Sequence, residues 1–411
     1  MKVAFVSEHA SPLATVGGVD SGGQNVHVAE LARALGALGH QVTVFTRRDG
    51  TSVRDRVRMC RGVVVEHVPA GPPAALPKDR LLPYMKPFGR YLAARWLRDP
   101  PDIVHAHFWM SGLAALAGAR EHGLPVVQTF HALGVVKRRH QGAEDTSPES
   151  RIRTEVAIAR DVALVLATSC DEERELARLG VPPARISVVP CGVDVAAFRP
   201  DGPVARRGAR PRVLAAGRLV RRKGFETVVR AMPEVPGTEL VIAGGPAAGR
   251  LRGDAEYRRL SRLAAELGVA ERVAFRGRVG RADMPALMRS ADLVVSVPWY
   301  EPFGMVPLEA MACGVPVVAS AVGGQADTVQ DGVTGALVPP RDPAALSRIL
   351  RDLLGREDLA RYGAAAAEHA RDRYAWPRIA QETAAVYEQV RHQHAARSTA
   401  ARATQRISAA R

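Results

Sequence analysis

Two carboxylates stand eight residues apart around the start of a predicted apolar helix. Glu301 lies in the loop before this helix, and Glu309 lies about two turns inside it, next to Ala310, Met311 and Ala312. A polar cap on the loop would explain Glu301 but not Glu309, because a buried carboxylate without a partner is costly. Carboxylates accept strong hydrogen bonds from hydroxyl groups, and a helix start attracts anions. The pair therefore predicts a site for a polyhydroxylated anion, aided by the backbone N–H groups of Phe303, Gly304, Met305 and Val306.

Two cations follow a predicted strand in the same half of the chain. Arg218 and Lys223 belong to the segment Gly-Arg-Leu-Val-Arg-Arg-Lys-Gly at residues 217–224. A charge run by itself usually covers a solvated surface. A strand-loop-helix turn instead brings both cations to the carboxyl edge of a sheet beside a helix N-terminus, where they can neutralise a diphosphate. We therefore interpret Arg218 and Lys223 as diphosphate ligands.

A glycine-rich loop precedes the first predicted helix. Residues 17–25 read Gly-Gly-Val-Asp-Ser-Gly-Gly-Gln-Asn and follow the first predicted strand. A flexible surface loop would explain one glycine pair better than two, so we favour contact with an anion or a substrate. The dinucleotide-binding spacing Gly-x-Gly-x-x-Gly is absent, and a loop over residues 8–22 is too long for the tight turn of that motif.

The elements that must position these residues alternate between strands and helices along the chain. A helix is predicted over residues 23–38, and further helices start near residues 223, 254, 282 and 307. The predicted strands cover residues 2–7, 41–46, 63–68, 102–105, 125–129, 162–168 and 186–189, and then 212–216, 239–243, 272–275, 293–297, 316–319 and 336–338. This alternation predicts an α/β fold of doubly wound parallel sheets with helices on both faces.

The chain of 411 residues is long enough for two such domains. We assign residues 1–190 to an N-terminal domain, 191–211 to a hinge and 212–373 to a C-terminal domain. A last helix over residues 374–391 precedes an Ala/Arg/Ser/Thr-rich stretch, 392–411, that we expect to be a disordered basic tail. Two facing sheets create a cleft at the carboxyl ends of their strands, where ligands of such sheets bind.

The composition narrows the function classes. The net charge is +15, and only five of the 57 basic residues are lysines. No nucleic-acid-binding motif accompanies the arginines, so we favour a solvated basic surface over nucleic-acid binding, with weak contact to an acidic membrane surface as a lesser alternative. No apolar run is long enough to span a bilayer. The short apolar N-terminus reads as a first strand and the four scattered cysteines lack paired spacing, so we expect a cytoplasmic protein.

These motifs resemble a known family. Glu-Pro-Phe-Gly-Met-Val-Pro-Leu-Glu-Ala at residues 301–310, with the 217–224 segment, looks like the family-4 retaining glycosyltransferases of the GT-B fold. Ser-Gly-Gly-Gln-Asn at 21–25, residues 102–112 and Thr-Phe-His-Ala-Leu at 129–133 are most similar to the sucrose-phosphate synthase and mycothiol-glycosyltransferase branch. The resemblance covers residues 1 to about 390. It implies two Rossmann-like domains facing a cleft, with the last helix crossing back onto the first domain.

The resemblance assigns the donor site residue by residue. Arg218 and Lys223 would hold the diphosphate, and Glu309 would bind the ribose hydroxyls. Glu301 and the amides from Phe303 to Val306 would hold the donor sugar. The remaining donor contacts would be Gly23 at the distal phosphate, His131 near the reacting carbon, and Arg278 and Val279 under the base, which would be uracil.

The same resemblance suggests an acceptor site in the N-terminal domain. Its residues would be Gly22, Gly23, Asn25, Lys78, His107, Phe108, Arg151 and Arg153. In the mycothiol branch the matching positions surround a phosphorylated inositol, so a small or phosphorylated acceptor is expected. Phe108 stands where that branch has a tyrosine, which puts inositol phosphate itself in question. His105 and His107 straddle a strand end, so we expect one to face the sheet and the other the cleft; as a pair they lack a third metal ligand.

We therefore expect a retaining, metal-independent glycosyltransferase without a cofactor. It would move a hexose or N-acetylhexosamine from a UDP-sugar by front-face displacement. A nucleotide-sugar epimerase and a non-catalytic sugar-nucleotide-binding protein remain as alternatives. A glycan phosphorylase would need a Schiff-base lysine, and Lys223 is the only lysine of the second domain.

Overall fold

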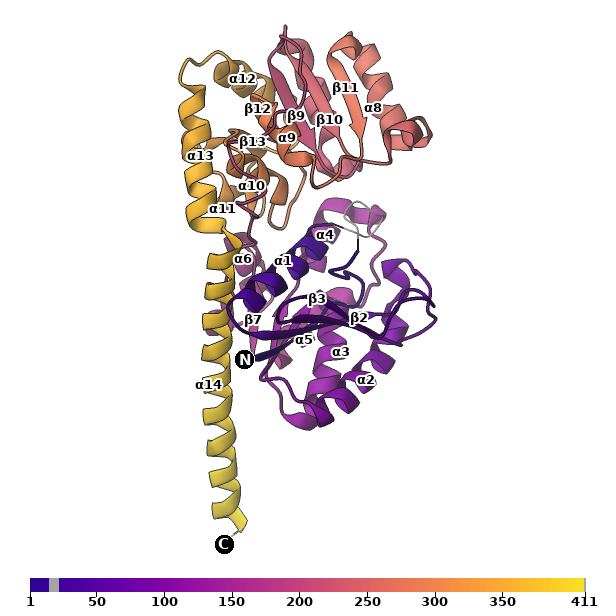
Figure 1. The fold of residues 1–411 in the computed structure, drawn as a ribbon, viewed down its shortest axis with the longest axis vertical. Helices are drawn as coiled ribbons and strands as arrows, with labels where there is room; N and C mark the ends of the chain where they lie inside the picture. Colours follow the sequence, from indigo (N-terminus) through magenta and orange to yellow (C-terminus); the bar gives the residue numbers. More distant parts are fainter. Residues whose placement is uncertain (15–21, 410–411) are drawn as a thin grey trace.

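A computed structural model describes residues 1–14 and 22–409. Residues 17–21 of the glycine-rich loop lie outside the described part, whereas Gly22 and Gly23 lie within it. The chain forms two α/β domains stacked along the long axis of the molecule, and one long helix runs beside the first domain (Figure 1).

The first domain surrounds a sheet of eight strands in the order β3-β4-β2-β1-β5-β6-β7-β8. Its strands are β1 (Lys2–Val6), β2 (Gln41–Arg47), β3 (Arg56–Cys60), β4 (Val63–Val68), β5 (Ile103–His107), β6 (Val126–Thr129), β7 (Leu164–Ala167) and β8 (Ile186–Val188). Its helices are α1 (Gly23–Ala37), α2 (Met85–Arg98), α3 (Trp109–Ala119), α4 (Gly134–Gln141), α5 (Arg151–Asp161) and α6 (Cys170–Arg178).

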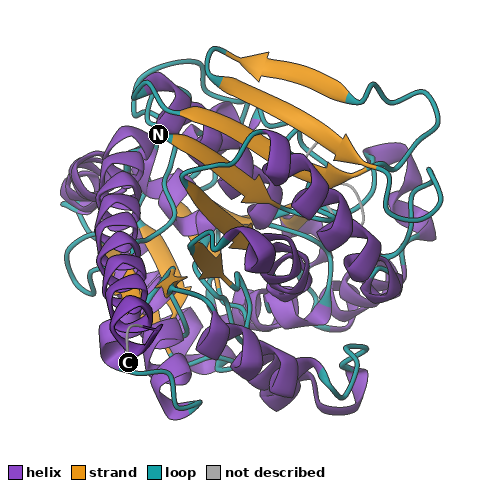
Figure 2. Cartoon of the chain, turned by 90° about the horizontal axis from the view of Figure 1, so that it is seen from below, coloured by secondary structure: helices purple, strands orange, loops and turns teal. Residues whose placement is uncertain are grey.

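Alternate residues of the central strand enter two different cores. Val3 and Phe5 pack in the core that contains α1 and the last helix, α14 (Trp376–Ala409), whereas Ala4 and Val6 pack in the core that contains α2 and α3. Successive strand side chains point to opposite faces, so a strand that is apolar throughout requires cover on both. Figure 2 shows helices on both sides of this sheet.

The edge strand β3 departs from the all-parallel sheet that the sequence predicts. It pairs antiparallel with β4, whereas the other pairs of this sheet among the described residues are parallel. The turn between β3 and β4 contains Gly62, with φ of +78°. β3 was not predicted; its sequence, Arg-Val-Arg-Met-Cys, contains two arginines and no buried residue, as suits an edge strand with one partner.

The second domain contains a parallel sheet in the order β11-β10-β9-β12-β13-β14. Its strands are β9 (Arg212–Ala216), β10 (Glu239–Ala243), β11 (Val273–Gly277), β12 (Leu293–Ser296), β13 (Val317–Ser320) and β14 (Gly335–Val338). Its helices are α7 (Phe225–Ala231), α8 (Ala255–Glu266), α9 (Met284–Arg289), α10 (Met305–Ala312), α11 (Gln325–Thr328), α12 (Pro343–Leu354) and α13 (Leu359–Tyr374). The strand order reverses direction between β9 and β12, which is where open α/β sheets bind ligands.

Helix α14 (Trp376–Ala409) begins at the junction of the domains and packs on the first one. The sequence predicts an end near Arg391 and a disordered tail, but the structure continues the helix to Ala409. Val390 still packs on the core. Beyond it, the helix continues because the tail is rich in alanine, arginine and glutamine, which favour helix. The last two residues, 410–411, lie outside the described part.

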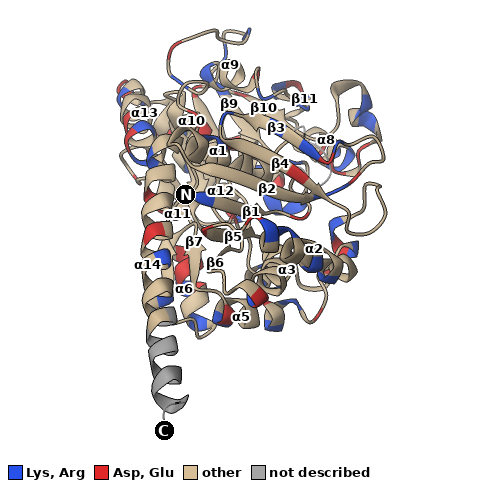
Figure 3. Cartoon of the chain, turned by 60° about the horizontal axis from the view of Figure 1, so that its bottom comes forward, with Lys and Arg blue, Asp and Glu red and all other residues tan. Residues whose placement is uncertain are grey.

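The surface carries its positive charge on both domains. Figure 3 shows lysines and arginines distributed over many elements, interspersed with acidic residues. Among the described residues, no helix combines the length and apolar character needed to cross a bilayer.

Candidate active site

The loop between β12 and α10 forms the centre of the site. Gly304 is the N-cap of α10 and has φ of +99°, a conformation that glycine adopts without strain. A Cβ at this position would lie 2.8 Å from the Gln325 side chain, so glycine is required for space as well. The turn points the N-terminus of α10 toward the first domain, because a Cβ built on Gly23 at the start of α1 would lie 3.7 Å from Met305 Cγ. Two helix N-termini, each a place where anions bind, therefore face each other across the cleft.

Glu301 and Lys223 meet directly at this loop. Lys223 Nζ donates a hydrogen bond to Glu301 Oε2, and the Arg222 guanidinium lies 4.0 Å from the same oxygen. Burial alone would raise the pKa of Glu301, but the charges of Lys223 and Arg222 lower it below its usual value. The carboxylate is therefore ionised and Lys223 is held at the carboxyl edge of the second sheet.

Close packing fixes the turn that carries Lys223. Gly224 has φ of +74°, and a Cβ there would lie 1.9 Å from the carbonyl oxygen of Val297 at the end of the neighbouring strand. Arg218 lies at the start of this turn and lines a hollow with Arg222 and Trp299. Its charge also contributes to lowering the pKa of Glu301. The structure thus brings Arg218, Lys223 and Glu301 together, as the motifs predict.

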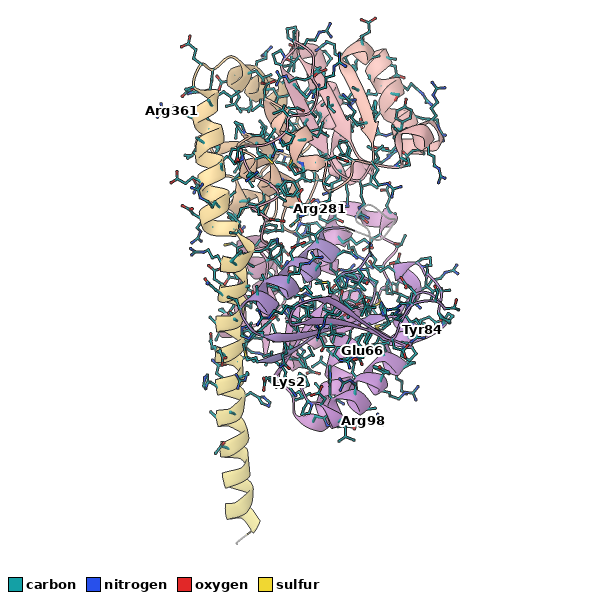
Figure 4. The ribbon with its side chains drawn as sticks, viewed as in Figure 1. Lys2, Glu66, Tyr84, Arg98, Arg281 and Arg361 are labelled. Atoms are coloured by element: carbon teal, nitrogen blue, oxygen red, sulfur yellow. The ribbon has the colours of Figure 1, made fainter. Side chains whose placement is uncertain are left out.

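Glu309 lies inside α10 and is 7% exposed. Burial raises the pKa of its carboxyl group, although Arg281 Nη1 donates to Glu309 Oε1 at 2.7 Å and opposes the rise. Arg281 lies on the side of the second domain that faces the first (Figure 4). It belongs to the loop after β11, in which Arg278 is exposed and Val279 is partly buried.

Four histidines cluster under the floor of the cleft in the first domain. The expectation that His105 and His107 face different ways is wrong: residues two apart on a strand share a face, and their rings lie 4.1 Å apart with both side chains buried. His107 Nδ1 lies 3.1 Å from Nε2 of His131, which has φ of +60° at the end of β6. His27 of α1 completes the group, with its ring centroid 5.0 Å from that of His131.

The predicted acceptor residues divide into two groups. Lys78 and Arg151 both lie over the Phe108 ring, at 5.6 and 5.1 Å from its centroid, and the three residues line one small pocket. Arg151 is buried and bonded to Glu155, Ser147 and the carbonyl of Ala132, so it orders the loop after His131.

Asn25 and Arg153 lie apart from the pocket over Phe108. The Asn25 side chain accepts from the Gly22 N–H and donates to the carbonyl of Ser11, which fixes the start of α1. Arg153 is exposed and does not line that pocket.

Comparisons with known proteins agree with this geometry. The family described as Glycosyltransferase Family 4 matches residues 21–197, and the one described as Glycosyl transferases group 1 matches residues 202–370. A D-inositol 3-phosphate glycosyltransferase of Streptomyces scabiei is 37% identical over 96% of this chain and 92% of that protein. The protein of the same name from Mycobacterium marinum is 38% identical over 90% of this chain and 82% of its own length. The chain is a family-4 glycosyltransferase.

Solved structures confirm the GT-B fold of this glycosyltransferase. A sucrose-phosphate synthase from Thermosynechococcus elongatus matches with a TM-score of 0.86 and 33% identity, covering 95% of this chain and 99% of that one. HepE of Anabaena, solved with UDP and glucose, matches with a TM-score of 0.71 and 22% identity over 94% of this chain and 99% of that one. The predicted resemblance and fold class are therefore confirmed.

The glycosyltransferase also has contacts between its domains that the sequence did not indicate. Gln141 Nε2 donates to Tyr300 Oη at 2.7 Å, and the His140 ring stacks on Tyr300 with centroids 5.1 Å apart. His140 and Tyr300 border a pocket of about 210 Å³ that reaches from Ala132 to Glu301. On another side of the interface, the Cys170 N–H at the start of α6 donates to Asp327 Oδ2 at 2.7 Å.

Sequence reasoning missed His27, Arg281 and Tyr300. His27 was readable as one polar residue on the buried face of α1, two positions after Asn25. Arg281 and Glu309 are 28 positions apart in the sequence, so no local sequence pattern predicts their contact. Tyr300 precedes Glu301 directly and could have been included with that motif.

Proposed function

We propose that this glycosyltransferase moves a hexose or N-acetylhexosamine from a UDP-sugar to a small or phosphorylated acceptor, with retention and without a metal ion. The observation that carries the proposal is the joint position of Lys223, Glu301 and the N-terminus of α10 at the edge of the second sheet, facing Gly23. Cations, a helix start and a carboxylate together fit a diphosphate joined to a sugar.

The donor contacts follow from this arrangement. The diphosphate would lie against Lys223 and Arg218, and its charge would replace Glu301 as the partner of Lys223. Released from the lysine, Glu301 would accept hydrogen bonds from sugar hydroxyls, together with the amides of α10. Glu309 would accept from the two ribose hydroxyls beside Arg281. The base would lie against Arg278 and Val279 at the end of β11.

Catalysis would then be electrostatic. As the bond from the anomeric carbon to the diphosphate breaks, negative charge grows on the leaving phosphate, where Lys223 and Arg218 stabilise it. The acceptor hydroxyl would attack from the face that the phosphate leaves, and its proton would pass to a phosphate oxygen, which retains the configuration. His131 would lie at the sugar. Two cations would supply the neutralisation that a metal ion supplies elsewhere, which supports a metal-independent reaction.

A phosphorylated acceptor is supported by two features of the first domain. Lys78 and Arg151 place two cations over Phe108 beside a pocket. The relatives from Streptomyces and Mycobacterium carry the name D-inositol 3-phosphate glycosyltransferase. We further propose a cytoplasmic reaction, since a reducing compartment suits the four free thiols at Cys60, Cys170, Cys191 and Cys313.

The proposal is tested with a panel of nucleotide sugars and no acceptor. Purified protein is incubated with each donor in the presence of chelator, and nucleotide release is followed. We expect slow UDP release from one UDP-sugar, lost in Arg218→Ala and Lys223→Ala. Arg361→Ala is the matched control, because it removes the same charge from α13 far from the cleft (Figure 4).

Three outcomes would contradict the proposal. Conversion of the sugar without release would indicate an epimerase. Release that stops with chelator would refute metal independence. Failure of every donor to bind would refute the donor assignments of Glu301, Glu309, Arg218 and Lys223.

A further inference from the structure

Three of the clustered histidines come from separate elements and converge on one point. His27 lies on α1, His107 ends β5 and His131 follows β6. One ring nitrogen from each lies within 4.8 Å of the other two. Nitrogens bound to one tetrahedral zinc ion stand about 3.3 Å apart, because each Zn–N bond is about 2.0–2.1 Å. His107 Nδ1 and His131 Nε2 share a hydrogen bond of 3.1 Å and so already lie at this spacing, which an ion would take over from the shared proton.

Some ring nitrogens of the cluster have no hydrogen-bond partner in the part of the chain that the structure describes, which indicates a place for a ligand. Nε2 of His27 and Nε2 of His107 are buried, and neither has a hydrogen-bond partner among the described residues. The side chains of His27 and His107 are 3% and 0% exposed, so bulk water does not satisfy them. Buried polar atoms are normally paired. Nε2 of His27, whose Nδ1 already contacts Cys191 Sγ, is therefore the nitrogen available to bind a ligand.

The chemistry of the three rings suits a cation rather than an anion. A neutral imidazole nitrogen has a lone pair that a cation can bind, whereas an anion needs hydrogen-bond donors. Imidazole is a preferred ligand of Zn²⁺, Cu²⁺, Fe²⁺ and Ni²⁺.

Outer contacts hold two of the rings in place. His27 Nδ1 lies 3.2 Å from Cys191 Sγ, and the ring packs against Trp376 of α14 with centroids 5.5 Å apart. A metal-binding histidine typically uses its second nitrogen in such a contact, which fixes the tautomer and leaves the other nitrogen for the ion. His107 packs against His105 with the ring planes tilted by 37°, and the nitrogens of His105 contact Tyr387 Oη at 2.6 Å and Thr129 Oγ1 at 2.8 Å.

We propose that His27, His107 and His131 form a binding site for one transition-metal dication of the zinc class. Three imidazoles would fill three positions of a tetrahedron, and water or a bound ligand would take the fourth, as in other three-histidine sites. Entry would be from the cleft, because His131 is only half-buried and its neighbours Ala132 and Leu133 line the pocket between the domains. The inference goes beyond glycosyl transfer and does not depend on it, although both involve His131.

The proposed metal site is tested with Co²⁺ alone, because the visible absorption of this ion distinguishes tetrahedral from octahedral coordination. Tag-free, full-length protein is stripped with chelator, dialysed and titrated with Co²⁺. We expect one equivalent with tetrahedral absorption, which Zn²⁺ then displaces. His27→Phe keeps a ring against Trp376 but removes a ligand, so affinity should fall at least tenfold. The matched control is His369→Phe, because His369 also has a buried Nε2 without a partner but belongs to α13 in the second domain.

A second ligand variant, His107→Gln, keeps the test decisive if His27→Phe does not fold, as judged by circular dichroism. Octahedral absorption only, or unchanged affinity in the folded ligand variant, would overturn the proposal and assign binding to exposed histidines such as His392. UDP binding is measured on the same samples as an independent check, because the proposed UDP ligands belong to the second domain. Absence of metal binding by the unsubstituted protein with its UDP binding intact would therefore refute the metal site and leave the transferase proposal untouched.

Discussion

At the scale of single residues, the contact between Lys223 and Glu301 determines what each can do without a donor. The two side chains are 18% and 15% exposed and neutralise each other. Removing one partner leaves the other charge buried beside the cleft, which is costly.

The first prediction separates the roles of these two residues. Lys223→Ala should lower the rate of UDP release on the order of 100-fold, because it removes stabilisation of the leaving phosphate. Glu301→Gln should leave UDP affinity within a few fold but weaken binding of the intact UDP-sugar. Calorimetric titration with UDP and with the UDP-sugar measures both. Equal losses for UDP and UDP-sugar in Glu301→Gln would contradict a role at the sugar.

The second prediction concerns the pH dependence of donor binding through Glu309. Its pKa is raised by burial, and only the ionised carboxylate accepts two ribose hydroxyl hydrogens. UDP therefore binds the deprotonated form and releases a proton, so affinity should fall as pH is lowered toward the raised pKa, by up to about tenfold per pH unit below it.

Titrations of UDP from about pH 8 to about pH 5 measure this slope. Glu309→Gln should bind more weakly and show a shallower dependence, because only the nucleotide phosphate then titrates. Parallel curves for the two proteins would exclude Glu309 from the nucleotide site.

Residue types were predictable here where local spacing encodes them. Glu301 and Glu309 share one short motif, and Arg218 and Lys223 share another. Arg281 and His27 were not predictable, because their partners Glu309, His107 and His131 are brought near by topology alone. The common orientation of His105 and His107 was predictable, because residues two apart on a strand share a face, and the expectation overlooked this periodicity.

At the scale of elements, the start of α10 depends on a glycine. Gly304→Ala, the third prediction, should lower the free energy of unfolding by more than about 1 kcal/mol, because φ of +99° and the Gln325 side chain both oppose a Cβ. UDP-sugar affinity should fall as well, since the amides of α10 would shift. Gly249→Ala is the control, because a Cβ there meets no atom within 4 Å. Denaturant unfolding curves measure the difference, and equal losses in both variants would contradict the argument.

The fourth prediction concerns how α14 is attached to the first domain. Tyr387 Oη contacts His105 Nδ1 at 2.6 Å in a fully buried setting. Tyr387→Phe should destabilise the protein by about 1–3 kcal/mol, because it leaves a buried imidazole nitrogen without a partner. Tyr362→Phe, a half-buried tyrosine beside Arg356, should have little effect. Thermal unfolding compares the two, and similar midpoints would show that the contact adds little.

Many strands were predictable because they are short apolar runs, and several helices because their apolar residues recur at helical spacing. β9 and β10 have the predicted bounds, and α7, α8, α9 and α10 begin within about two residues of the predicted positions. The predicted elements omitted the edge strand β3 and several helices, among them α2, α3 and α5, and they ended α14 too early, where no breaking residue marks a boundary.

At the scale of the whole molecule, the two domains share one continuous core. It runs from Phe5 and Leu31 through Val193 and Phe198 of the linker to Leu308 and Met311 of α10. Two hydrogen bonds between the domains add to this core. One joins Gln141 to Tyr300 on the cleft side, and the other joins Cys170 to Asp327 on another side of the interface. A motion that opens the cleft must break these two hydrogen bonds while the core in the linker bends.

Because of its contact with Asp327, the reactivity of the Cys170 thiol should report on the distance between the two domains. Cys170 is exposed, and the pKa of its thiol is raised by partial burial and by the nearby Asp327 carboxylate. Separation of the domains would remove that negative charge and increase the thiolate fraction, so alkylation of Cys170 should speed up. Saturating UDP-sugar, if it favours closure, should slow the reaction, and Asp327→Asn should speed it without ligand. Since Cys191 and Cys313 are buried, peptide-resolved alkylation kinetics would follow opening and closing in the unlabelled, unmodified enzyme.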